Sequence, residues 1–147
     1  MYKSTHKNVV VLAIRPNYAH AIMSGEKKVE FRRNGAPINI THIVFYSTSP
    51  DQKIIGYCDV VQCVVTSPQT LWRKYGAQGG ISRKDFFTYY EGVTKGKCYI
   101  LKKPQRFVRP ILLKDCWSFS RPPQSFAYLC ENEWQRLKRK KTKRALK

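Results

Sequence analysis

Apolar and polar residues alternate in short blocks along this chain, and the first block is a continuous apolar run. Val9 to Ile14 is rich in β-branched residues, which predicts a buried strand. Arg15-Pro16 ends the run, and because proline suits the first turn of a helix, we predict a helix from Pro16 to about Ser24. Gly25 is the expected left-handed stop of that helix.

Five further stretches have the alternation or the β-branched content of strands. They are Lys27 to Arg33, Thr41 to Ser47, Lys53 to Val65, Lys97 to Leu101 and Phe107 to Leu113. Gly56 interrupts the longest of them and predicts a bulge or bend there. The chain therefore carries about six strands.

Three more helices are predicted from capping signals. Ser67-Pro68 begins one that continues to Tyr75, since serine caps helices and proline follows it well. Ser82 and Asp85 have the spacing of a capping box, with Asp in place of the usual Glu. Pro122-Pro123 restarts the chain as a helix, with apolar residues every three or four positions as far as Leu137.

The strands do not alternate regularly with helices, which predicts an α+β fold rather than a parallel α/β fold. We expect a small, mostly antiparallel, closed or nearly closed sheet with helices at its sides. The sequence has no internal repeat, no Gly-rich phosphate loop and no G-x-S-x-G elbow.

The segment from Gly25 to Arg33 concentrates opposite charges on one predicted strand. Lys28, Glu30 and Arg32 would share one face, with Val29 and Phe31 on the other. Lys27 lies at the preceding turn and could reach the charged face. A carboxylate between cations can orient them, accept a hydrogen bond or transfer a proton. The alternative is a solvated edge strand with a surface ion pair, worth only about 0–1 kcal/mol.

The net charge of +19 indicates a polyanionic partner. Residues 136–147 hold eight cations and no acid. Removing them from the 28 cations of the chain leaves 20 against nine acids, a net charge of +11, so the preceding domain is itself basic. We therefore predict one domain over residues 1–135 and a basic tail over 136–147. RNA or another single-stranded nucleic acid is the expected partner, because the tail lacks the apolar face of a membrane-surface helix.

The cysteines and histidines do not form the patterns of a metal site or a disulfide framework. The five cysteines include no C-x-x-C pair, and Cys58 and Cys63 would point to opposite faces of one strand. We expect no metal, no cofactor and a reducing compartment, the cytoplasm. The basic tail would also suit a nuclear or nucleoid location. No signal peptide and no run of membrane-spanning length is present in the sequence.

The residues Gly25, Lys27, Glu30 and Arg32 match the G-x-K-x-x-E-x-R motif of ASCH-domain proteins, a branch of the PUA-like superfamily. The resemblance covers roughly Val9 to Leu113. It implies a PUA-like small β-barrel with flanking helices, a cleft beside the motif and an RNA-binding role, regulatory in transcription or translation.

Some ASCH proteins are amidohydrolases that deacetylate a modified cytidine, and others are reported as nucleases. In the amidohydrolases the lysine matching Lys27 is catalytic, but a threonine stands where this chain has Glu30. Their further catalytic glutamate would fall near Gln78 or Gly79, and neither is acidic. Three functions therefore stay open: an RNA-binding protein, a hydrolase acting on RNA or a modified nucleoside, and a transcription-linked interaction module.

The candidate catalytic residues, should the chain be an enzyme, are Lys27, Glu30 and Arg32. Arginine would clamp a phosphate bidentately better than lysine. The resemblance places the end of the Thr41 to Ser47 strand beside the cleft, where Tyr46 could stack a base. The candidate nucleic-acid-binding residues are Arg15, Lys27, Lys28, Arg32, Arg33, Tyr46, Ser47, Lys138, Arg139, Lys140 and Lys141.

Overall fold

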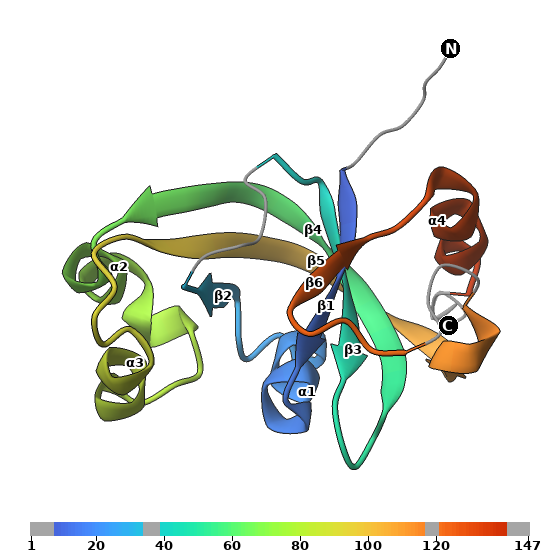
Figure 1. Cartoon of the computed structure of the whole chain (residues 1–147), viewed down its shortest axis with the longest axis horizontal. Helices are drawn as coiled ribbons and strands as arrows, with labels where there is room; N and C mark the ends of the chain where they lie inside the picture. The colour runs from blue at the N-terminus through green and yellow to red at the C-terminus, as the bar shows by residue number, and fades with distance from the viewer. Residues whose placement is uncertain (1–7, 34–38, 117–120, 141–147) are drawn as a thin grey trace.

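A curled sheet forms the centre of the molecule (Figure 1). The computed structural model describes residues 8–33, 39–116 and 121–140. Its strands are β1 (Val9–Ile14), β2 (Val29–Arg32), β3 (His42–Ser47), β4 (Lys53–Thr66), β5 (Gly96–Leu112) and β6 (Phe126–Tyr128). Its α-helices are α1 (Pro16–Ser24), α2 (Pro68–Tyr75), α3 (Arg83–Tyr89) and α4 (Glu131–Lys138), with 3₁₀ turns η1 (Gly76–Gln78) and η2 (Leu113–Asp115).

The six strands of the described residues form one mixed sheet in the order β2-β5-β4-β3-β1-β6. The pairing of β1 with β3 is parallel, and the other pairings are antiparallel. The sheet curls into a half-barrel with α2 and α3 at one end and α4 at the other (Figure 1). The predicted α+β fold, a mostly antiparallel and nearly closed sheet with flanking helices, is confirmed.

Both faces of the central strands are buried, which explains why β1 is apolar throughout. Val10 and Leu12 join a cluster with α1, and Val11 joins a second cluster with Trp134 and Leu137 of α4. A strand with two covered faces reads as a continuous apolar run rather than an alternating one. A third cluster joins β2 to α2 and α3 and fixes the position of the charged strand.

The predicted helix boundaries of the first three helices agree with the structure. Gly25 has a φ of 90° and its N–H closes α1 on the carbonyl of Ile22. Ser67 and Ser82 accept hydrogen bonds from the backbone N–H groups of Thr70 and Asp85.

Two predictions of the secondary structure were wrong. Lys97 to Leu101 and Phe107 to Leu113 are not separate strands, because β5 continues from Gly96 to Leu112. Lys103 has a positive φ of 53° and the register shifts nearby, so a bulge accommodates Pro104 without ending the strand. A similar register shift in β4 lets Cys58 and Cys63 pack against the same core cluster, the one that contains Val10 and Leu12. The prediction that these two cysteines point to opposite faces of the strand was therefore wrong.

The helix predicted from Pro122 begins only at Glu131. Phe126–Tyr128 is instead the sixth strand, which pairs with Val10–Leu12 and supplies the hydrogen bonds that the free side of β1 requires. Helix α4 ends at Lys138, so it crosses the boundary predicted between domain and tail at residue 135.

Candidate nucleic-acid cleft

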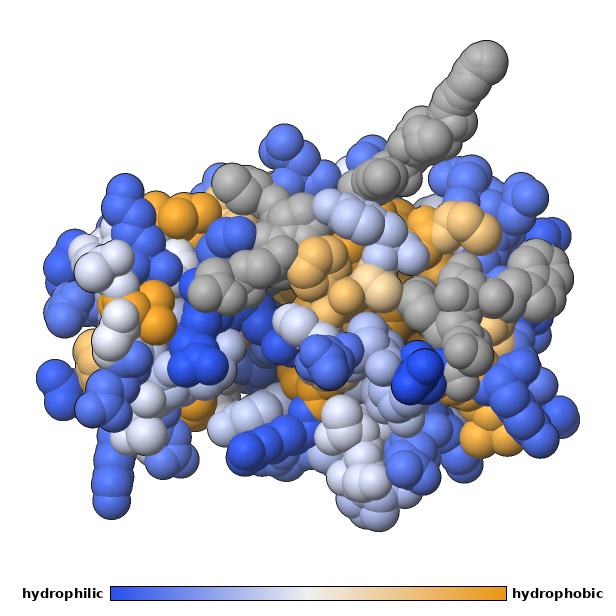
Figure 2. All heavy atoms as spheres, in the orientation of Figure 1, coloured by the Kyte–Doolittle hydropathy of each residue, from blue (hydrophilic) through white to orange (hydrophobic). Residues whose placement is uncertain are grey.

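A cleft of about 460 Å³ lies where the half-barrel stays open, between the end of β1 and the edge strand β2. Helices α1 and α3 form its sides (Figure 1). Strongly hydrophilic residues gather on the surface between these two helices (Figure 2). The lining residues are Ala13, Ile14, Arg15, Tyr18, Lys27, Glu30, Phe31, Arg32, Ile81, Asp85, Thr88 and Tyr89.

Lys27 is only 4% exposed, which is unusual for a lysine. Its Nζ donates to the carbonyl oxygen of Gly79 at 2.5 Å and lies 3.4 Å from Oε1 of Glu30. The same atom lies 5.1 Å from the ring centre of Tyr18 and 5.7 Å from that of Phe31. Lys27 is therefore held in place by an acceptor, a counter-charge and two aromatic rings.

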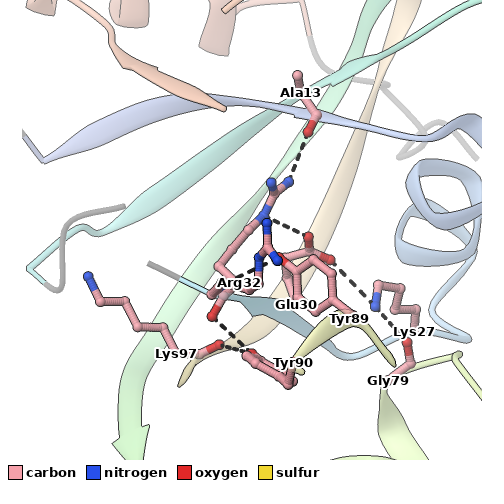
Figure 3. Close-up of polar contacts among 9 residues, drawn as sticks. Ala13, Lys27, Glu30, Arg32, Gly79, Tyr89, Tyr90 and Lys97 are labelled. Carbon is pink, nitrogen blue, oxygen red and sulfur yellow. Dashed lines mark hydrogen bonds and ion pairs between the residues drawn. The ribbon is translucent and has the colours of Figure 1, made fainter. Parts of the chain in front are cut away.

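Glu30 lies between the two cations (Figure 3). Its Oε1 faces Lys27, and its Oε2 lies 3.0 Å from Nε of Arg32. The carboxylate is 6% exposed, so the ion pairs act in a medium less polar than water. In this arrangement Glu30 braces the cations.

Arg32 joins the two sides of the open barrel. Its Nη2 donates to the carbonyl oxygen of Ala13 on β1 at 2.8 Å (Figure 3). Its buried Nε contacts Glu30 as an ion pair and has no aligned hydrogen bond. The guanidinium is partly exposed to the cleft, and arginine binds phosphate with paired donors. Arg32 can therefore bridge the gap between β1 and β2, called the seam below, and also bind an anion.

Tyr89 forms one side of the cleft, and Tyr90 supports the strand from behind. The single hydrogen of the Tyr90 hydroxyl is shared between the carbonyl oxygens of Arg32 at 2.9 Å and Lys97 at 3.2 Å, so it ties β2 to β5 (Figure 3). Burial raises the pKa of Tyr90 above its usual range. Burial also raises the pKa of Tyr89, although the nearby Arg32 opposes this. Both phenols are therefore protonated at neutral pH.

The other cations predicted near the cleft have different positions. Arg15 lines the cleft from the end of β1, with an exposed side chain. Lys28 is exposed outside the cleft, since β2 begins at Val29 and the turn before it directs Lys27 inward instead. Arg33 is exposed, and its guanidinium lies 5.4 Å from the ring centre of Tyr89.

Tyr46 and Ser47 do not lie in the cleft. Tyr46 is 4% exposed and packs in the cluster beneath α4, so its ring offers no free face to a base. Ser47 is fully buried and donates to a carboxylate oxygen of Asp51 at 2.8 Å, and His20 contacts the same oxygen. These hydrogen bonds from Ser47 and His20 lower the pKa of Asp51.

The predicted contacts of the basic tail lie at the opposite end of the molecule. Lys138 is the last residue of α4, and Arg139 and Lys140 follow the helix. Nζ of Lys138 lies 5.3 Å from the ring centre of Trp134. Lys141 lies outside the described residues.

Sequence reasoning missed several residues of the cleft. Asp85 and Tyr89 are four residues apart on α3 and therefore share a face, a spacing that could have paired them. Tyr18 sits one turn before the buried Ile22 on α1, which could have placed it at the edge of the core. No sequence signal pointed to the main-chain carbonyls of Ala13 and Gly79.

The described residues lack two further features, a membrane-spanning helix and a metal-binding cluster. None of their helices has the length and apolar character needed to cross a membrane. They contain no group of three His, Cys, Asp or Glu residues placed to hold a metal ion.

Comparison with known proteins gives consistent matches. The ASCH domain family matches residues 12–111. The ASCH domain-containing ribonuclease of Zymomonas mobilis is 35% identical over 131 residues, covering 86% of this chain and 88% of the relative. The crystal structure of ASCH from Zymomonas mobilis superposes with a TM-score of 0.85 at 32% identity, covering 93% of this chain and 98% of that one.

A second kind of relative is much longer than this chain. The large ribosomal subunit protein uL22 of Ureaplasma parvum is 30% identical over 122 residues, which cover 82% of this chain but 39% of the relative. The family match and the full-length Zymomonas relative agree with each other and with the PUA-like half-barrel described above. This chain belongs to the ASCH-domain family.

Proposed function

We propose that this chain binds single-stranded RNA, with one nucleotide entering the cleft beside Lys27, Glu30 and Arg32. The observation that carries the proposal is the construction of the cleft, which combines aromatic sides with a buried cationic floor. Its volume of about 460 Å³ is in the range of small-molecule sites. A single strand can turn a base into such a hollow, whereas a duplex keeps its bases stacked.

The aromatic residues give the cleft surfaces for stacking. Tyr18 comes from α1 and Tyr89 from α3, so their side chains approach from different elements. Stacking of one base on an aromatic side chain is worth about 1–3 kcal/mol. Arg15 and Arg32 would meet the phosphates on either side of that base, since both line the cleft. Affinity would then depend on stacking as well as on charge.

RNA cleavage is the second candidate function, and the Zymomonas relative favours it. A protein named a ribonuclease matches 86% of this chain at 35% identity. When a phosphate draws Arg32 away, Oε2 of Glu30 becomes free to take the proton of the ribose 2′-hydroxyl while its oxygen attacks the phosphorus. The P–O5′ bond breaks in the same step, and the leaving 5′-oxygen takes a proton from water. Arg32 and Lys27 would then stabilise the charge that develops on the phosphate oxygens. Hydrolysis of an acetylated cytidine has less support. The resemblance would require a catalytic glutamate near Gln78 or Gly79, but Lys27 instead donates there to the main-chain carbonyl oxygen of Gly79.

The experiment is fluorescence anisotropy of labelled single-stranded RNA, duplex RNA and duplex DNA at two salt concentrations, with each RNA examined afterwards for cleavage. The proposal expects preference for the single strand and binding that persists at the higher salt. Equal binding to all three ligands that disappears at the higher salt would contradict it, since charge alone gives that result. Shortened single strands would support cleavage, and intact RNA would support binding alone.

We also propose that the chain is located in the cytoplasm, or in the nucleus or nucleoid through the basic segment that begins at Arg136. The positive charge of this segment supports that proposal.

A further inference from the structure

A second hollow, a groove of about 840 Å³, lies at the end of the molecule that carries α4. The cleft is lined by residues of α1 and α3, and α3 lies at the end of the molecule away from α4 (Figure 1). Hydrophilic residues also cover much of the α4 end in Figure 2. The charged residues of the groove are Arg109, Lys114, Asp115, Arg136, Arg139 and Lys140.

The walls of the groove are held by specific contacts. Strand β2 covers only Lys97 to Ile100 of β5, so the later half of β5 has a free side. There the N–H of Val108 donates to the carbonyl oxygen of Lys140 at 2.9 Å, which attaches the end of α4 to the strand. Arg136 donates to the carbonyl oxygen of Asp115 and to the fully buried carboxylate of Glu133. The shape is therefore set by β5, η2 and α4 together.

Four of the cations around this groove are exposed and unpaired. In the described part of the chain, no ion pair or side-chain hydrogen bond is formed by Arg109, Lys114, Arg139 or Lys140. Asp115 is the single acidic residue among the described residues that line the groove. Like charges gathered around one hollow repel each other, and a polyanion relieves that repulsion while it releases its own counterions.

We propose that this groove binds the phosphate backbone of the same RNA strand whose nucleotide enters the cleft. The inference rests on the proposed function. Strand β5 connects the two hollows, because Lys97 pairs with Arg32 and Arg109 lies twelve residues further along. At a rise of about 3.3 Å per residue, the two positions are at most about 40 Å apart. A single strand of moderate length spans that distance.

Most of the groove lies beyond the segment that matches the ASCH family. The match ends at residue 111, whereas Lys114, Asp115, Arg136, Arg139 and Lys140 all follow it. The family match therefore gives no role to this surface. Charge complementarity and the four unpaired cations support its role as a second contact for the strand.

The test replaces the four unpaired cations together, as Arg109→Gln, Lys114→Gln, Arg139→Gln and Lys140→Gln. A control variant removes four exposed cations elsewhere, as Arg73→Gln, Lys74→Gln, Lys84→Gln and Lys95→Gln. Because both variants lose the same charge, any difference reports local contact rather than the overall field. Binding is measured for single-stranded RNA of about 4 and about 16 nucleotides, the range covered by known single-strand sites.

The expected result is weaker binding of the long RNA by the groove variant than by the control, with equal binding of the short RNA. Each phosphate contact makes the slope of log K against log salt more negative by about 0.7. In the groove variant the slope should therefore become less steep by up to about 3. A double variant, Arg109→Gln with Lys114→Gln, should change this salt slope by about half as much.

Equal losses in the groove and control variants would overturn the inference, because only total charge would then matter. Equal weakening of short and long RNA by the groove variant would also overturn it. Failure of the wild-type chain to prefer single-stranded RNA would instead overturn the proposed function. The two failures are therefore distinguishable.

Discussion

The ammonium of Lys27 lies 3.4 Å from a carboxylate oxygen of Glu30, and both side chains are more than nine-tenths buried. Burying two charges costs several kcal/mol per ion, and good geometry with further hydrogen bonds offsets that cost. Arg32 and the carbonyl oxygen of Gly79 complete the set. Lys27 and Arg32 are therefore oriented before any ligand arrives.

Replacing Glu30 with glutamine should lower stability and separate binding from catalysis. Two buried cations lose their counter-charge, so unfolding should become easier by about 3 kcal/mol, the lower end of the range because glutamine still accepts hydrogen bonds. RNA affinity should hold or rise, since both cations become available, and any cleavage should stop. The control is Glu26→Gln, an exposed acid in the same turn. Thermal unfolding and anisotropy measure these effects, and identical melting of the two variants would contradict the account.

The Arg32→Lys variant should loosen the seam between β1 and β2. Lysine cannot contact Ala13 and Glu30 together as the guanidinium does. We expect the free energy of unfolding to fall by about 1–2 kcal/mol and the melting temperature to fall by roughly 2–8 °C. RNA binding should also become weaker. Arg33→Lys is the control, because Arg33 is exposed at the end of the same strand. Equal losses in both variants would show that the seam contact is unimportant.

A methyl group at Gly79 should displace the loop that holds Lys27. An added Cβ would overlap the ring of Phe31, which would have to shift from its edge-on contact with Phe86, where the ring centres are 4.8 Å apart. We expect Gly79→Ala to cost about 1–3 kcal/mol, as overpacking does, and to weaken RNA binding. Gln78→Ala should leave both unchanged, since its side chain is exposed and only its main chain contacts Lys28. Chemical denaturation of the two variants makes the comparison.

His42 should make the fold less stable as the pH falls. Burial lowers its pKa below the ordinary value of 6.5, with Asp59 opposing this and Lys138 adding to it. His42 takes up a proton near pH 6.5 in the unfolded chain but only at a lower pH in the folded chain. The free energy of unfolding therefore decreases as the pH drops below about 6.5. The measurement is denaturation at pH 7 and pH 5. His42→Gln should show a smaller difference between the two, and an unchanged difference would contradict the prediction.

The sequence predicted the positions of the elements where a local signal existed. The apolar run of β1, the stop at Gly25 and the serine caps at Ser67 and Ser82 each depend on neighbouring residues, and all agree with the structure. The helix predicted from Pro122 was wrong because Phe126–Tyr128 pairs with β1, a contact between distant segments. Periodicity within one segment carries no information about such a partner.

The candidate site was predicted in part for a similar reason. Glu30 and Arg32 are two residues apart on one strand, so the alternation of side chains predicted that both lie on the same face of the sheet. Both line the cleft. Lys27 entered the cleft because of the turn before β2, and the carbonyl oxygens of Ala13 and Gly79 come from segments far away in the sequence. Main-chain acceptors have no residue type, so no sequence pattern could have identified them.

The measurement that most directly tests the role of the cleft compares Lys27→Met with Lys28→Met in anisotropy titrations of single-stranded RNA. Both variants lose one positive charge from adjacent positions, but only Lys27 lies in the cleft. We predict that Lys27→Met weakens binding at least about tenfold, or 1.4 kcal/mol, while Lys28→Met stays close to the wild type. Equal affinities for the two variants would contradict the proposal that RNA binds in this cleft.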